Sequence, residues 1–211
     1  MGRQERGAEA PASTVLARHL ADGTPPAVRP VDVLVAARRH FLAGERVDMG
    51  NVAAELGISR ATLYRWVGTR ELLLGEILWS LAQRGLAEAR AAATGRGVDR
   101  VMQFYERFLH LTAAHPAIRR FVENEREAAL RILTSREGVQ QRRLIDALRA
   151  LLEELARAGE LELRIDAADL AYVMTRIGES FIWREFVTGE EPDLARAAEI
   201  VRLLLGCAAG R

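Results

Sequence analysis

Residues 47–74, VDMGNVAAELGISRATLYRWVGTRELLL, decide the fold of this chain. The apolar spacing of a first short helix stops at Gly57, and a second pattern starts after Ser59. Glycine adopts the left-handed backbone that a tight turn needs, and serine is a favoured residue at the start of a helix. The stretch therefore predicts a helix-turn-helix, with its two helices over 48–55 and 59–66.

The second helix of this unit has one face for the core and another for a partner. Leu63, with Trp66 or Val67, is expected to point inward. Small and hydrogen-bonding side chains at the start of a helix suit the major groove of DNA, where arginine can bond guanine and threonine can contact a thymine methyl. The side chains expected to point outward are Arg60, Ala61, Thr62, Tyr64 and Arg65.

This segment resembles the DNA-binding domain of the TetR family of transcriptional regulators. The matching stretches are AAELGIS at 53–59, TLYR at 62–65 and GTRELL at 68–73. The resemblance implies base contacts from the start of the second helix, a phosphate contact from Tyr64, and a following helix whose start faces the DNA backbone. The DNA-binding residues that it implies are Arg60, Ala61, Thr62, Tyr64, Arg65, Thr69 and Arg70.

Three departures from the family pattern involve four positions. Arg70 stands where lysine is usual, which keeps the charge but changes its geometry. Trp66 and Val67 replace a common His-Phe pair, so the packing beneath the second helix is expected to differ. Asp48 replaces a serine or threonine that contacts phosphate, and we expect no such contact from an acid, because like charges repel.

Proline usage and apolar spacing indicate an all-α fold for the whole chain. After residue 30 the prolines are Pro116 and Pro192, and apolar residues in 170–181 and 194–205 recur at helical spacing. About nine helices are predicted, over 31–44, 48–55, 59–66, 70–93, 98–114, 117–133, 137–158, 166–188 and 193–208. We expect three parts: a flexible N-terminal extension (1–30), a helix-turn-helix DNA-binding domain (31–75), and a ligand-binding and dimerisation domain (76–211).

The composition removes several enzyme classes. All 30 basic residues are arginine, so a Schiff-base lysine, a P-loop lysine and a kinase lysine are all excluded. The Glu-x-x-His motif of metal-binding helical bundles is also missing from the sequence. We therefore expect a protein that is not an enzyme and that needs no cofactor and no metal.

The charge of residues 31–80 bears on how DNA would be held. This segment contains six arginines and six acidic residues, so its net charge is zero. Because affinity for DNA comes largely from neutralising phosphates, one such domain would bind weakly. Two copies in a homodimer on a near-palindromic operator would compensate.

Signals for export or membrane insertion are not visible in the sequence. The first 30 residues lack a continuous apolar run, and apolar runs elsewhere are far shorter than a membrane span requires. The single Cys207 cannot form a disulfide within the chain and indicates a reducing compartment. We expect a cytoplasmic protein with no membrane partner.

The resemblance also implies a homodimer and a small-molecule effector. The last two predicted helices carry more apolar surface than one core can use, which favours dimerisation over burial within one chain. The predicted interface residues are Ile177, Phe181, Leu194, Ala197, Ala198, Val201 and Leu205. The predicted pocket residues are Trp79, Gln83, Phe104, Tyr105, Phe108, Phe121, Asn124, Arg131, Tyr172, Thr175, Glu179 and Trp183.

Residues 121–138, FVENEREAALRILTSREG, further resemble a TetR subgroup that regulates the degradation of quorum-signal lactones. This second resemblance implies a lactone as the effector. Together, these features predict a DNA-binding transcriptional regulator, most often a repressor in this family, that a small molecule releases from its operator. The alternative is a helical-bundle ligand carrier or adaptor whose helix-turn-helix is vestigial.

Overall fold

The computed structural model describes residues 28–134 and 139–206, and within them every regular element is a helix. The predicted extension falls almost wholly on residues 1–27, outside the described part, as does Cys207. Eleven helices are described, which confirms the predicted all-α fold. They are α2 (Pro30–Ala43), α3 (Met49–Glu55), α4 (Arg60–Val67), α5 (Arg70–Ala92), α6 (Gly97–Ala113), α7 (Pro116–Asn124), α8 (Arg126–Thr134), α9 (Val139–Arg157), α10 (Ala167–Ile182), α11 (Arg184–Thr188) and α12 (Leu194–Gly206).

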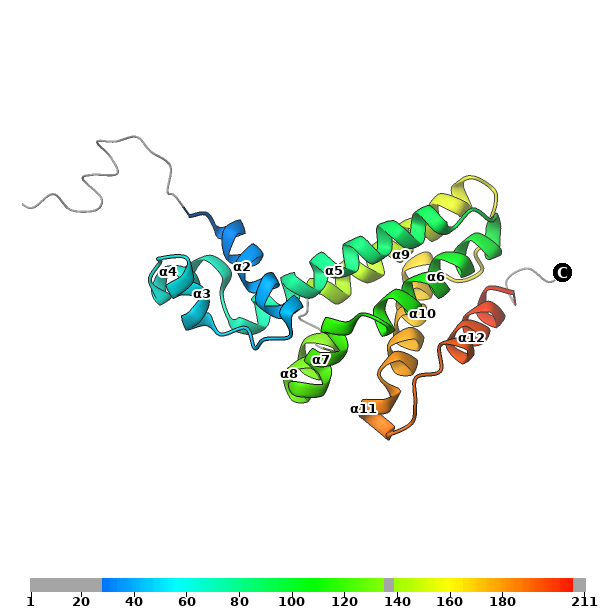
Figure 1. Cartoon of the computed structure of the whole chain (residues 1–211). Helices are drawn as coiled ribbons and strands as arrows, with labels where there is room; N and C mark the ends of the chain where they lie inside the picture. Colours follow the sequence, from blue (N-terminus) through cyan, green and yellow to red (C-terminus); the bar gives the residue numbers. More distant parts are fainter. Residues whose placement is uncertain (1–27, 135–138, 207–211) are drawn as a thin grey trace, which may run out of the picture.

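Helices α2, α3 and α4 form a head at one end of the molecule (Figure 1). Each of its two short helices starts at a side-chain cap. The Asp48 carboxylate accepts from the backbone N–H of Gly50 (2.8 Å) and Asn51 (2.9 Å), and Ser59 Oγ accepts from Thr62 N (3.1 Å). Gly57, between them, has φ +65°, the conformation predicted for the turn.

The remaining helices form a body that α5 joins to the head (Figure 1). Helix α5 packs against α6 and α9, α10 packs against α9, and α12 packs against α6 and α10. Fully buried aliphatic side chains run without interruption from Leu63 in the head through Ile77 to Leu152 and Met174 in the body. Head and body therefore share one close-packed core.

Two predicted helices are each divided in the structure. The segment 117–133 breaks at Glu125, whose φ of −132° and ψ of 48° are not helical, and 166–188 breaks at Trp183. Neither position is a glycine or proline. Glu125 instead binds Arg70, which is distant in sequence, and the Trp183 ring is buried in the core. At Glu125 a tertiary contact overrode a continuous helical pattern.

Among the described helices, none has the length and apolar character needed to cross a membrane.

Candidate nucleic-acid interface and internal cavity

Helix α4 presents the face predicted for DNA. Leu63 is completely buried, and Trp66 and Val67 pack partly buried against the same core, as expected. On the opposite side Arg60, Ala61, Tyr64 and Arg65 are exposed. Thr62 is half-buried, and its Oγ1 accepts from Ser59 Oγ at 3.0 Å. The exposed set combines charge, a small side chain and a phenol, which suits groove and phosphate contacts.

The two residues at the start of α5 differ: Thr69 is exposed to solvent, and the Arg70 side chain points into the protein. Thr69 is exposed, and its Oγ1 accepts from Leu72 N at 3.3 Å. Arg70 is only 17% exposed, donating from Nε to Val47 O (2.6 Å) and from Nη2 to Glu125 Oε1 (2.7 Å). The guanidinium thus links the head to the α7–α8 break, a connection that the sequence analysis missed.

Acidic side chains of the head serve its own structure. Hydrogen bonds from the backbone, first that of Asn51, hold the pKa of Asp48 below its usual range, so the cap is ionised. This accounts for an acid where a phosphate contact is usual in the family. Nearby, His40 Nε2 and Glu55 Oε2 lie 2.8 Å apart, and Glu45 hydrogen-bonds the other ring nitrogen.

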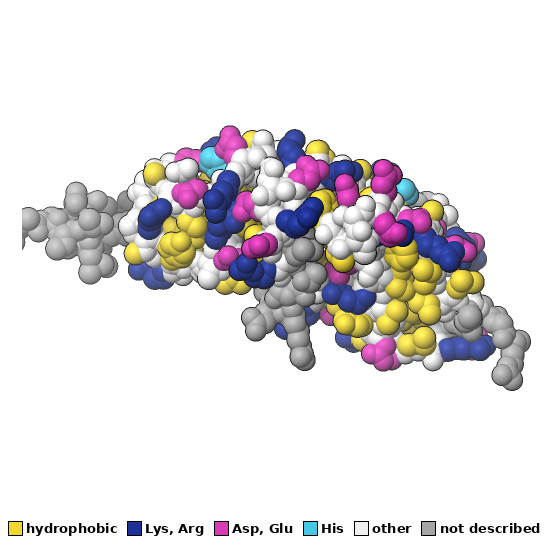
Figure 2. Space-filling view, turned by 90° about the horizontal axis from the view of Figure 1, so that it is seen from below, with side chains coloured by type: hydrophobic (Ala, Val, Ile, Leu, Met, Phe, Trp, Pro, Cys, Tyr) yellow, Lys and Arg dark blue, Asp and Glu magenta, His cyan; other side chains and the backbone are white. Residues whose placement is uncertain are grey.

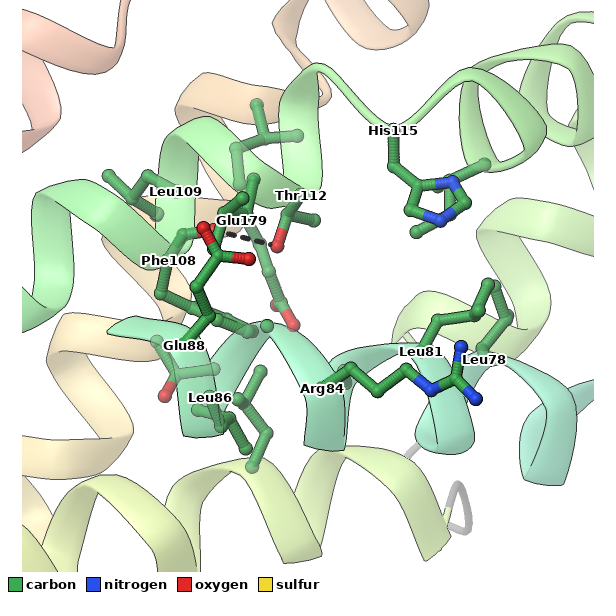
Figure 3. Close-up of a pocket in the computed structure, with 18 of the residues that line it drawn as sticks. Leu78, Leu81, Arg84, Leu86, Glu88, Phe108, Leu109, Thr112, His115 and Glu179 are labelled. Atoms are coloured by element: carbon green, nitrogen blue, oxygen red, sulfur yellow. Dashed lines mark hydrogen bonds between the residues drawn. The ribbon is translucent and has the colours of Figure 1, made fainter. Parts of the chain in front are cut away.

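The body contains an apolar cavity of about 260 Å³ between α5, α6, α9 and α10 (Figure 3). This is just below the usual range of ligand pockets, roughly 300–1,000 Å³. Six of the predicted pocket residues line it: Phe104, Tyr105, Phe108, Thr175, Glu179 and Trp183. The lining residues that the prediction missed include Leu78, Leu81, Arg84, His115, Ile118 and Leu148.

Glu179 is the buried carboxyl of this cavity. Arg176 forms an ion pair with it, and Gln141 Nε2 donates to its Oε1 at 3.3 Å. Burial raises the pKa of Glu179 to about 7, because these two partners only partly offset the loss of water. The negative charge of the ionised carboxyl is therefore only partly compensated.

Close approach of α10 to α6 places further polar atoms at the cavity. A Cβ on Gly178 would lie 2.8 Å from Leu109 Cδ2 and 3.0 Å from Tyr105 Oη, so glycine is what permits this approach. The Tyr105 hydroxyl donates to Met174 O at 2.9 Å. Burial raises the pKa of Tyr105, so the phenol keeps its proton.

The other predicted pocket residues lie elsewhere. Phe121, Asn124 and Arg131 line a second, more polar cavity of about 520 Å³, where α7 and α8 meet the loop that follows α2. The remaining three, Trp79, Gln83 and Tyr172, are among the lining residues of neither cavity. Trp79 instead lies under the Arg143 guanidinium, 5.5 Å from the ring centre. Aromatic residue type alone does not distinguish these three environments.

The predicted dimer residues contribute to the core of the protomer. Ala197, Ala198, Val201 and Leu205 of α12 are buried inside the protomer and have almost no exposed area. The others, Ile177, Phe181 and Leu194, pack partly buried against the same core. Their spacing marked the inner face of each helix, and periodicity cannot say which interior a face enters.

The described residues contain no group of three histidine, cysteine or acidic side chains placed to hold a metal ion.

Comparisons with known proteins agree with this architecture. The family model described as "Tetracyclin repressor-like, C-terminal domain" matches residues 96–206. The solved structure of the transcriptional repressor QsdR of R. erythropolis, from the TetR family, is similar with a TM-score of 0.80 at 25% identity, covering 86% of this chain and 96% of that chain.

Further solved structures share the fold at lower identity. The TetR family repressor AlkX of Dietzia sp. strain DQ12-45-1b has a TM-score of 0.58 at 24% identity, covering 89% of this chain and 100% of that one. A putative TetR-family regulator of Rhodococcus sp. has a TM-score of 0.51 at 16% identity, with 86% and 98% covered. Among the curated protein sequences, none matches. An identity of 25% is too low to assign the QsdR subgroup, but the family match spans more than half of the chain. The chain therefore belongs to the TetR family, whose members are transcriptional regulators and not enzymes.

Proposed function

We propose that this regulator binds a near-palindromic operator as a homodimer, represses transcription there, and is released when a small molecule enters the apolar cavity. The observation that carries the proposal is the exposed face of α4 on a head whose buried core continues to that cavity. In this proposal residues 31–75 read DNA, and 76–211 sense and dimerise, preceded by an extension over 1–30. The protein acts in the cytoplasm, and the effector class that the sequence resemblance implies is a lactone.

The coupling runs through α7. Its start, at His115 and Ile118, lines the apolar cavity together with Leu42 of α2. Further along α7, Arg120 Nη2 donates to Leu42 O at 3.0 Å, and the Phe121 ring lies 5.3 Å from the ring of Phe41. A ligand that displaces α7 would therefore turn the head as well.

Release needs a difference in affinity between two conformations. A ligand that bound the operator-competent and the released conformations equally would shift nothing. The effector must bind the released conformation more tightly, and its binding would then separate the two α4 helices from half-sites one DNA turn apart.

The dimer would use the outer faces of α10 and α12. Tyr172, Val173 and Leu203 are 53%, 40% and 61% exposed, more than a monomer core explains. Figure 2 shows hydrophobic side chains gathered on the body, away from the head. Partly exposed Ile177 and Phe181 lie on the same helix as Tyr172 and would add to the interface.

The test is a selection of the full chain against random duplex DNA at near-physiological salt. We expect a near-palindrome to be enriched, and the Thr62→Ala, Tyr64→Ala double variant to enrich none. Arg60→Ala and Arg157→Ala form a charge-matched pair on α4 and on the far end of α9, and only the first should weaken operator binding. A carrier or adaptor with a vestigial head would give no enriched sequence from the unmodified chain.

A further inference from the structure

The hydroxyl groups around the apolar cavity have no proton to give a ligand. Tyr105 donates to Met174 O (2.9 Å), Thr175 to Ala171 O (2.8 Å) and Thr112 to Phe108 O (2.9 Å, dashed in Figure 3). A carbonyl oxygen can only accept, so in each pair the hydroxyl must be the donor. What these three groups offer the cavity is therefore lone pairs.

The carboxyl at the cavity adds to this excess of acceptors. Glu179 lies one turn beyond Thr175 on α10, and its Arg176 and Gln141 partners leave it with a pKa raised to about 7. The ionised group only accepts hydrogen bonds, whereas the protonated group keeps an accepting oxygen and gains one O–H donor. A donor arriving with a ligand would supply what the protein leaves missing.

The nitrogen groups that line the cavity do not reverse this balance. His115 Nδ1 is buried without a hydrogen-bond partner, and burial lowers the pKa of the ring, so the neutral imidazole brings one N–H donor and one acceptor nitrogen. Arg176 Nε is also buried without a partner, but Arg176 is not among the residues that line the cavity. Arg84 and Glu88 also line the cavity, but both side chains are exposed, and Glu88 pairs with Arg107. The charged donor is thus in contact with solvent.

The charges around the cavity further restrict the class of ligand that can bind. Arg176 already compensates Glu179, so a bound cation would add an unpaired positive charge next to them, and a bound anion would face the carboxyl and the hydroxyl lone pairs. An uncharged ligand avoids both costs. The remainder of the lining is aliphatic and aromatic, which favours a compact apolar body.

We propose that the cavity takes a small uncharged molecule with an apolar body and one hydroxyl or amide N–H that donates to Glu179. This inference rests on the proposed function, in which the cavity is the effector site. A lactone ring by itself brings only acceptors, so a lactone effector would need an N–H or O–H outside the ring.

Four probes with a similar body test the proposal on the full chain by calorimetric titration at a pH above the Glu179 pKa of about 7, where the carboxylate only accepts hydrogen bonds. Benzyl alcohol and anisole are isomers, and only the alcohol has a donor; benzylamine and benzoate are the cationic and anionic counterparts. We expect benzyl alcohol to bind about tenfold or more tightly than anisole, because a hydrogen bond to a buried carboxyl separates them, and both ions to bind more weakly than the alcohol.

Variants assign the preference to Glu179. In Glu179→Gln the amide can donate to the ether oxygen of anisole, so the preference for the alcohol should fall close to one. Glu199→Gln is the matched control, because Glu199 forms the same i,i+3 pair with Arg196 on an exposed surface. That control should keep the preference of the unmodified chain. If Glu179→Gln does not fold, the relative affinities of benzyl alcohol and anisole for the unmodified chain still test the proposal.

The proposal is overturned if alcohol and ether bind equally, if benzoate or benzylamine binds most tightly, if no probe binds, or if the preference survives in Glu179→Gln. None of these results would affect the DNA selection, which tests the regulator directly. Conversely, if the DNA selection enriched no sequence, the probe titrations could still be interpreted, because they measure ligand binding and not DNA binding.

Discussion

The head and the body are held together in different ways. Helices α3 and α4 have seven and eight residues, too short to be stable alone, and each depends on a side-chain cap. Helices α5 and α9 have 23 and 19 residues and bury rows of large aliphatic side chains against each other. The head is thus the part whose structure rests on few interactions, and its attachment to α7 fixes its orientation. A reading head that can turn on a rigid body is what release by an effector requires.

The largest expected effect separates the cores of the two parts. Leu63 and Leu152 are both completely buried, one under α4 and one in α9. Either substitution to alanine should cost about 2–5 kcal/mol of unfolding free energy. Leu63→Ala should abolish operator binding and raise amide hydrogen exchange in α3 and α4 first, whereas Leu152→Ala should raise exchange throughout the body. Uniform exchange in Leu63→Ala would show that the head does not open as a separate unit.

The next effect concerns the link between the parts. Arg70 and Glu125 are each less than a fifth exposed, so losing the pair should cost about 1–2 kcal/mol, as for a partly buried charged hydrogen bond. We expect Glu125→Gln to weaken operator binding about tenfold and Arg70→Ala somewhat more, because Arg70→Ala also removes the hydrogen bond to Val47 O. The double variant should be little worse than Arg70→Ala, because the two substitutions remove the same ion pair.

A phosphate contact by Arg70 predicts a different result. Arg70→Ala alone would then weaken binding and would lower the salt dependence by roughly one released ion. Glu125→Gln would leave affinity unchanged or raise it. Titrations at several salt concentrations distinguish a structural link from a phosphate contact.

The contrast between head and body also explains which features of the structure could be predicted from the sequence. Signals in the head are local: Asp48, Gly57 and Ser59 each determine a cap or turn within a few residues, and the structure has the two short helices where they were predicted. The exposed side chains of α4 followed from the same periodicity. Short-range chemistry was sufficient there.

In the body, contacts between residues distant in sequence determine where helices break and which faces are buried. The break at Glu125 depends on Arg70, 55 positions earlier, and no residue near Glu125 announces it. The α12 positions at helical spacing are buried within the protomer, where α12 packs against α6 and α10. Periodicity finds a buried face without identifying its neighbour. The cavity likewise needs Gly178, whose missing side chain matters only once α6 lies against it.

A smaller effect is expected from the cap of α3. Asp48→Ala removes the acceptor for two backbone N–H groups and should cost about 1 kcal/mol, measured by thermal unfolding. Asp48→Ser keeps an acceptor and removes a negative charge from the head. It should therefore fold almost as stably and bind the operator more tightly than the unmodified chain. Equal operator affinity in Asp48→Ser would place this residue away from the DNA.

The smallest effect is a pH dependence confined to the head. Hydrogen bonds from the His40 ring to the Glu45 carboxylate, and then to that of Glu55, raise the pKa of His40 above its ordinary 6.5, and His40 lowers the pKa of Glu55 below its ordinary 4.5. A raised histidine pKa stabilises the fold below 6.5 and loses this contribution as pH rises through the folded value. The lowered glutamate pKa acts above 4.5 and is lost as pH falls through its folded value. The stability that this cluster gives the head should therefore be greatest between about pH 4.5 and pH 6.5 and should decline toward higher pH.

Hydrogen exchange in α2 and α3, measured from pH 4.5 upward, tests this pH dependence. The His40→Gln variant should remove the decline above pH 6.5 and leave exchange in α9 unchanged. A decline that persists in His40→Gln would assign the pH dependence to a group outside this cluster.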